Sequence, residues 1–149
     1  MDRLRVVSRV LFVCVHNAGR SKISQAPFNR AAGGAHQACS AGPAPAAHVH
    51  PEVIAVMDEL GIDLRDEKPK LLTRELAEWA DVVVTMGCGD ACPYSPGKRY
   101  LDWELEDPKG QSLDAVRATR DEIARRIDTL LSELEDHTIR RTRKSTVSG

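Results

Sequence analysis

The sequence lacks a long apolar run and carries almost no net charge. None of its apolar segments reaches the roughly 18 residues that a membrane-spanning helix needs, so we expect no membrane insertion. The formal net charge of the 149 residues is −1. A chain that is close to neutral does not offer the strongly basic surface of a nucleic-acid-binding protein.

Cysteine is also scarce, with residues at positions 14, 39, 88 and 92 only. Two disulfides in a secreted protein would account for an even number of cysteines. The N-terminal segment argues against secretion, because its apolar run is only about six residues long and no small-residue cleavage site follows it. We therefore expect free thiols in a reducing, cytoplasmic compartment. Cys39 lies in an apolar segment and is expected to pack in the core.

Length and composition fit one globular domain that needs no disulfide or metal to stabilise it. Hydrophobic residues make up 42% of the chain and charged residues 29%. The apolar periodicity of the last predicted helix stops near Asp136, and a basic segment follows. The expected division is a domain over residues 1–136 and a basic, disordered tail over residues 137–149.

Short β-branched runs alternate with helical patterns along the chain. The predicted strands cover residues 9–14, 36–41, 81–86 and 98–103, and the predicted helices cover residues 20–32, 51–60, 73–79 and 112–136. Pro27 lies inside the first helix and is expected to kink or end it. This alternation predicts a single three-layer α/β domain with a four-stranded parallel sheet and helices on both faces. Binding sites in such sheets lie beyond the carboxyl ends of the strands.

The first predicted strand leads into a loop that opens a helix. Its residues are Cys14, Val15, His16, Asn17, Ala18, Gly19, Arg20 and Ser21. Backbone N–H groups in such a loop can point inward and bind an anion, and the helix N-terminus adds partial positive charge. Arg20 supplies a planar fork that matches two oxygens of a tetrahedral oxyanion. The same field favours a thiolate at Cys14, so the loop can bind an oxyanion and also activate its attacker.

The spacing Cys-x5-Arg is also compatible with a buried core cysteine that precedes an ordinary turn. The strand before the loop, the helix after it and the Gly-Arg-Ser ending favour a functional loop. Gly19 permits close backbone approach, and Ser21 is able to donate a hydrogen bond to the thiolate. Chemistry at this loop also requires an acid, because an oxygen that leaves the substrate must be protonated. Asp107, which precedes Pro108 after the fourth strand, is the candidate, and a solvated acidic turn is an equally open interpretation.

Cys88 and Cys92 fall in a loop that follows the third predicted strand. They resemble half of a zinc site, but structural zinc needs four ligands with tighter spacing within each pair. The histidines that could complete such a site are scattered along the chain. We therefore expect no metal. The two thiols are either inert or take part in redox chemistry through at least one of them.

The residues of the loop and the later Asp-Pro pair together resemble a known family. They are similar to arsenate reductases built on the low-molecular-weight tyrosine phosphatase fold, and most similar to the actinobacterial, mycothiol-dependent type. Beyond the loop, the resemblance rests on residues 40–42, 61–63, 68–73, 80–93, 96–111 and 116–123. It covers most of the chain, from Arg9 to Leu134.

The resemblance implies an enzyme in which Cys14 is the nucleophile, Arg20 clamps the oxyanion and Asp107 is the general acid. Asn17 would shape the loop, and Ser21 would support the thiolate. Cys14 would attack arsenate to give a covalent adduct. An external thiol, mycothiol, would then take the arsenic, and a glutaredoxin-like partner would release arsenite. No bound cofactor is implied, since mycothiol acts as a co-substrate.

The chain departs from related enzymes in ways that keep alternatives open. Thioredoxin-coupled relatives use two further cysteines that lie farther apart than Cys88 and Cys92 do, so the external thiol is favoured over an intramolecular relay. Those relatives also bind a potassium ion through acidic ligands. Gln25 and Lys70 occupy two of the corresponding positions in this chain. The Lys70 ammonium is expected to replace the cation, so no potassium site is predicted. Low-molecular-weight protein tyrosine phosphatases share the loop but favour aromatic side chains beside the acid, where only Trp103 is available. A non-enzymatic oxyanion-binding or metal-responsive module is the remaining alternative.

Overall fold

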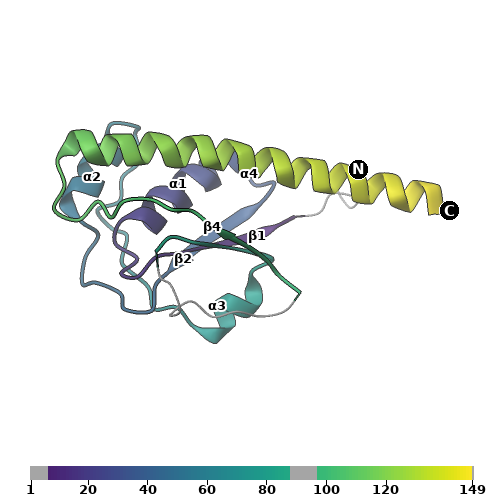
Figure 1. Cartoon of the computed structure of the whole chain (residues 1–149), viewed down its shortest axis with the longest axis horizontal. Coiled ribbons are helices and arrows are strands. Elements are labelled where there is room, and N and C mark those ends of the chain that lie inside the picture. The colour runs from purple at the N-terminus through teal and green to yellow at the C-terminus, as the bar shows by residue number, and fades with distance from the viewer. Residues whose placement is uncertain (1–6, 88–96, 149) are drawn as a thin grey trace.

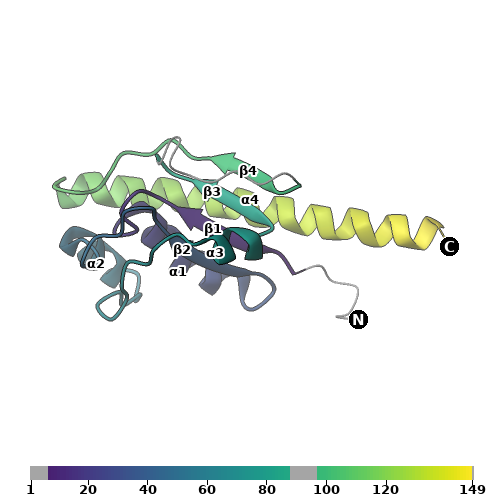
Figure 2. The ribbon, with the colours of Figure 1, turned by 90° about the horizontal axis from the view of Figure 1, so that it is seen from below.

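A computed structural model describes residues 7–87 and 97–148, with side chains described up to residue 135. Its four strands form one parallel sheet in the order β2-β1-β3-β4. The strands are β1 (Arg9–Val13), β2 (Gln37–Ala41), β3 (Val82–Thr85) and β4 (Arg99–Asp102). The helices are α1 (Arg20–Ala32), α2 (Pro51–Asp58), α3 (Arg74–Trp79) and α4 (Leu113–Ser148). In Figures 1 and 2, α1, α2 and α4 cover one face of the sheet and α3 covers the other. The predicted three-layer α/β fold is confirmed.

Strand β1 has apolar residues on both faces because helices cover both faces of the sheet. Val10 and Phe12 belong to the larger core cluster, which they share with α1, α2 and α4. Leu11 and Val13 belong to a smaller cluster on the side of α3. Successive side chains of a strand point to opposite faces, so a continuous apolar run serves both cores. The end of this strand, and with it Cys14, is held firmly in place.

Helix α1 continues through Pro27 and ends at Ala32, where Gly33 adopts a left-handed conformation. Pro27 therefore does not end the helix. An internal proline costs about 3 kcal/mol, whereas full burial of one large apolar side chain contributes about 1.5–3 kcal/mol. Ile23 and Phe28, on either side of Pro27, are fully buried. Phe28 also packs edge-on against Phe12, with a centroid separation of 5.7 Å.

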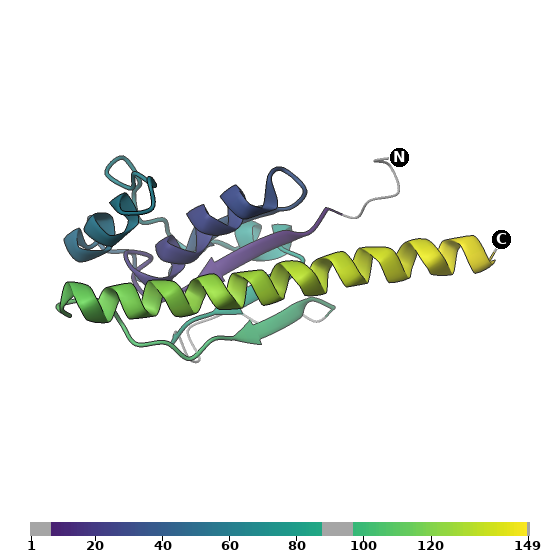
Figure 3. The same cartoon turned by 90° about the horizontal axis from the view of Figure 1, so that it is seen from above.

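Helix α4 runs from Leu113 to Ser148, past the end that the sequence predicted at Asp136. Figure 3 shows it lying along α1 and extending beyond the rest of the domain. Its buried stripe consists of Val116, Ile123, Ile127, Leu130 and Leu134. The division into a domain over residues 1–136 and a basic tail over residues 137–149 stays a prediction. Within the described part of the chain, no helix combines the length and apolarity needed to cross a membrane.

Candidate active site

The loop that joins β1 to α1 lies at the carboxyl edge of the sheet, and a chain of hydrogen bonds fixes its nucleophile. Cys14 is buried, and its Sγ lies 2.9 Å from Ser21 Oγ. Asn17 Nδ2 donates to the same Oγ at 2.7 Å. Because Ser21 Oγ accepts from Asn17, its own hydrogen is left to donate to the sulfur. A donor of this kind stabilises a thiolate relative to a thiol.

Asn17 also shapes the loop through its backbone, which adopts a left-handed conformation with φ of 50°. Asparagine tolerates this region better than most residues. Its Oδ1 accepts a hydrogen bond from the Lys70 backbone N–H at 2.8 Å, which anchors the loop to the segment before α3. Asn17 therefore links the nucleophile to a distant part of the chain.

The carbonyl groups of the loop are bonded outward, to the segment that precedes α2. The N–H groups of Ala44, Ala46 and His50 donate hydrogen bonds, each at 3.0 Å, to the carbonyls of Val15, His16 and Ala18, respectively. The N–H groups of residues 15–20 have no hydrogen-bond partner among the described residues. No described side chain caps α1, and its first turn contains no acidic residue. Unpaired N–H groups at a helix N-terminus form an anion-binding site.

Arg20 connects the loop with the segment that carries the candidate acid. Its Nη1 donates to the Leu105 carbonyl at 3.0 Å, and its Nη2 lies 4.0 Å from Asp107 Oδ2. Arg20 is largely buried, whereas Asp107 is about half exposed. The structure thus brings Cys14, Arg20 and Asp107 to one edge of the sheet, as the sequence analysis expected.

Three glycines allow this close packing. A Cβ at Gly42 would lie 2.3 Å from the Cys14 carbonyl oxygen, and one at Gly19 would lie 2.7 Å from Pro108 Cγ. A Cβ at Gly87 would lie 2.7 Å from Arg20 Nη1. Sequence reasoning noted only Gly19, because the neighbours of Gly42 and Gly87 come from distant segments of the chain.

Replacing Gly87 by alanine is expected to weaken the binding of inorganic phosphate about tenfold or more, because the new Cβ displaces the Arg20 guanidinium. The variant also places a side chain at a φ of 83°, which costs on the order of 1 kcal/mol. Phosphate affinity can be measured by protection of Cys14 from alkylation. Gly97→Ala is the matched control, since Gly97 has a φ of 88° and no atom of the described residues lies within 4 Å of the added Cβ. An equal loss in both variants would show that contact with Arg20 is not the cause.

A buried lysine beside the loop was missed by the sequence analysis. Lys22 is only 1% exposed, and its Nζ lies 3.5 Å from Glu67 Oε1. Burial lowers the pKa of Lys22 below its usual value, and Glu67 opposes this effect. Lys70, whose ammonium was expected to replace the potassium ion, is exposed and contacts the loop through its backbone. The only signal for Lys22 in the sequence was its position directly after Ser21.

Of the other three cysteines, Cys39 is the one that lies among the described residues. Cys39 is partly buried and packs against the smaller core cluster, as predicted. Cys88 and Cys92 lie outside the described residues. Among the residues that are described, no group of three or more His, Cys, Asp or Glu side chains is arranged to hold a metal ion.

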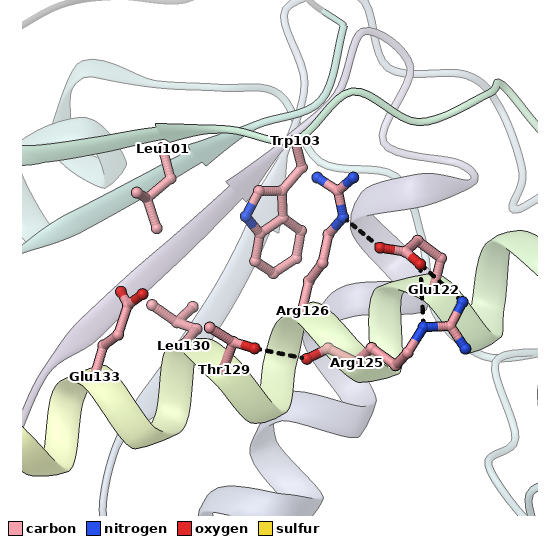
Figure 4. A pocket seen from close by; sticks show the side chains of 8 residues that line it. All are labelled: Leu101, Trp103, Glu122, Arg125, Arg126, Thr129, Leu130 and Glu133. Atoms are coloured by element: carbon pink, nitrogen blue, oxygen red, sulfur yellow. Dashed lines mark hydrogen bonds and ion pairs between the residues drawn. The ribbon is translucent and has the colours of Figure 1, made fainter.

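A cavity of about 340 Å³ lies between β4 and α4, away from the Cys14 loop (Figure 4). The Trp103 ring forms one wall, and charged side chains of α4 form another. Glu122 accepts hydrogen bonds from Arg125 and Arg126, so these charges are already paired. No residue of the loop lines this cavity, and it is not part of the candidate site.

Comparison with known proteins places these features in context. A family model described as low molecular weight phosphotyrosine protein phosphatase matches residues 9–140. The chain is 39% identical over 127 residues to a putative arsenate reductase of Halobacterium salinarum, covering 82% of this chain and 89% of that protein. It is 32% identical over 131 residues to a glutaredoxin arsenate reductase of Synechocystis, covering 86% and 99% of the two chains.

A solved structure gives a further comparison. The thioredoxin-dependent arsenate reductase of Corynebacterium glutamicum superposes with a TM-score of 0.74 and 43% identity. The match covers 87% of this chain but only 62% of that one, so this chain spans less than two thirds of the length of that protein.

Proposed function

The chain belongs to the low molecular weight phosphotyrosine protein phosphatase family, and on that premise we propose that it is an arsenate reductase with Cys14 as its nucleophile. The three relatives compared above are all named as arsenate reductases. The observation that carries the proposal is the hydrogen bond between Cys14 Sγ and Ser21 Oγ, in a loop whose N–H groups are unpaired among the described residues. This arrangement suits a thiolate that faces a tetrahedral oxyanion.

In the proposed first step, the Cys14 sulfur attacks arsenic and an As–O bond breaks as the S–As bond forms. The loop N–H groups and Arg20 hold the oxygens that remain on arsenic. Asp107 donates a proton to the departing oxygen, which leaves as water. Arsenic stays in its pentavalent state in this step, and the product is a covalent thiol–arsenate adduct on Cys14.

An external thiol, mycothiol, then takes the arsenic from Cys14, and a glutaredoxin-like redoxin completes the reduction to arsenite. The position of Cys39 supports an external thiol, because it packs in the cluster on the α3 side whereas Cys14 packs in the other cluster. This chemistry needs free thiols and hence a reducing compartment, so a cytoplasmic location is part of the proposal. A thioredoxin-coupled relay through Cys88 and Cys92 is the alternative, favoured by the name of the Corynebacterium relative.

Assays with each reductant system in turn test this proposal. Arsenate-dependent consumption of a reducing cofactor is expected with mycothiol and its redoxin, and not with thioredoxin and its reductase. A variant with both Cys88→Ser and Cys92→Ser is expected to keep its mycothiol-dependent rate within about threefold, since thiols that take no part in the proposed mechanism contribute little to the rate. Turnover that needs only thioredoxin and is lost in the double variant would establish the relay instead.

Hydrolysis of aryl phosphates is the second candidate function, because the matching family model describes phosphatases. The position of Trp103 speaks against it. This side chain is buried, and its ring packs against Phe12 with a centroid separation of 5.7 Å. It is therefore not free to stack on the aryl group of a substrate. Rapid aryl phosphate hydrolysis without arsenate turnover would make the chain a phosphatase.

A further inference from the structure

A second cavity, of about 630 Å³, is lined by residues around the start of α2, where His50 contacts the nucleophile loop. Its apolar part includes Val49, Pro51 and Ile54, and its polar part includes His48, His50 and Lys109. The His50 backbone N–H donates to the Ala18 carbonyl in the loop at 3.0 Å. The Lys109 backbone N–H donates to Asp107 Oδ1, also at 3.0 Å. The cavity walls are therefore tied to both the loop of the nucleophile and the candidate acid.

The His50 ring is the titratable group of this cavity that lies against the loop. A Cβ at Gly19 would lie 3.3 Å from His50 Cδ2 and 2.7 Å from Pro108 Cγ, so the ring packs beside both segments. Within the described residues, no hydrogen bond involves either of its ring nitrogens. His50 is half-buried, and its side chain lines the cavity. A ring nitrogen is thus available to a molecule bound there.

Burial of the His50 ring favours its neutral form at pH 7. Burial lowers the pKa of His50 below its usual value near 6.5, although Glu52 and Asp107 act to raise it. Lys109 and His16 lower it further. A neutral imidazole has one nitrogen that accepts a proton.

Arg65 and Glu67, which also line the cavity, already have ionic partners. Arg65 is already paired with Asp58 and Asp63, and Glu67 is paired with Lys22. An apolar floor with polar groups that orient a ligand is the usual composition of a small-molecule site. The volume suits a small organic molecule.

We propose that this cavity binds the low-molecular-weight thiol that takes arsenic from Cys14, and that His50 accepts the proton of that thiol. The inference rests on the proposed function. The thiol loses its proton to the imidazole, and its sulfur then attacks arsenic. A new S–As bond forms as the Cys14 S–As bond breaks, and the electron pair returns to Cys14 as a thiolate. Arsenic stays pentavalent, and the imidazolium proton passes to solvent.

The test compares two thiols of different acidity in the His50→Asn variant. His50 is the N-cap residue of α2. Asparagine is favourable at an N-cap, and its amide is polar but cannot act as a base. With mycothiol, the rate of thiol–arsenate formation is expected to fall about tenfold to a hundredfold, because the thiol loses its base. With 4-nitrothiophenol, which is ionised at pH 7, the rate is expected to change less than about threefold. Glu75→Gln, at an exposed position of α3 on the opposite face of the sheet, is expected to leave both rates unchanged.

Two results would overturn the role of His50: an unchanged rate with mycothiol, or an equal loss with both thiols, which would indicate a structural role. The proposed function is tested separately in the wild-type protein. If the wild-type protein transfers arsenic to neither thiol, that function fails and the thiol site fails with it. If the wild type is active and the His50→Asn variant does not distinguish the thiols, only the thiol-site inference fails. Equal protection of Cys14 by arsenate in the wild type and the variant would verify that the loop is intact.

Discussion

Replacing Cys14 by serine is expected to lower arsenate turnover by about 10⁴-fold or more, the usual effect of removing a catalytic nucleophile. A serine hydroxyl remains protonated at neutral pH unless a base activates it. The described contacts of Cys14 Sγ supply a hydrogen bond from Ser21 and no base. The site is thus arranged to stabilise a charge that serine does not carry. The measurement is steady-state arsenate turnover with mycothiol and its redoxin.

Cys39→Ser is the matched control for this experiment. Cys39 lies in β2 and packs against the smaller core cluster, away from the loop. Its replacement is expected to preserve the rate and to lower the free energy of unfolding by about 1 kcal/mol, because a hydroxyl replaces a packed sulfur. Thermal unfolding of both variants would show that loss of activity in Cys14→Ser does not come from loss of folding. Activity retained in Cys14→Ser would eliminate the proposed mechanism.

The fold could be predicted because local patterns and tertiary packing agree. The run from Val10 to Val13 is apolar without interruption, which is typical of a parallel strand buried on both faces. Thr73 was expected to cap the third helix, and its Oγ1 accepts a hydrogen bond from the Leu76 N–H at 3.2 Å. The course of α1 through Pro27 could not be predicted, because it depends on the packing of Phe28 against Phe12.

The parts of the site that are contiguous in sequence were predictable, and those assembled from distant segments were not. Residues from Cys14 to Ser21 form one loop, so their order alone indicated an oxyanion site. Gly87 and His50 contact the site only through folding, by way of Arg20 and Gly19. Lys22 directly follows the loop in the sequence, but its burial could not be predicted, because its ionic partner Glu67 lies in another segment. The roles of Cys88 and Cys92 stay predictions, because these residues lie outside the described part of the chain.

The Asp107 carboxyl is oriented by two neighbours. Its Oδ1 accepts a hydrogen bond from the Lys109 N–H at 3.0 Å, and its Oδ2 lies 4.0 Å from Arg20 Nη2. Because Oδ1 is already bonded to the backbone, Oδ2 is the atom that can carry a proton toward the substrate. Pro108 packs near Gly19 and limits movement of the acid relative to the loop. This arrangement supports the proposed role of Asp107 as the general acid.

Replacing Asp107 by asparagine is therefore expected to lower arsenate turnover by about 10²- to 10⁴-fold, the range for loss of a general acid. The amide keeps the size of the side chain but has no proton to give to the departing oxygen. Phosphate protection of Cys14 from alkylation is expected to remain within about threefold of the wild type, because the loop and Arg20 still bind the anion. Glu104→Gln removes a neighbouring exposed carboxylate and is expected to have little effect on turnover. Equal losses in the two variants would point to the general negative charge of this segment, and unchanged turnover in Asp107→Asn would require another acid.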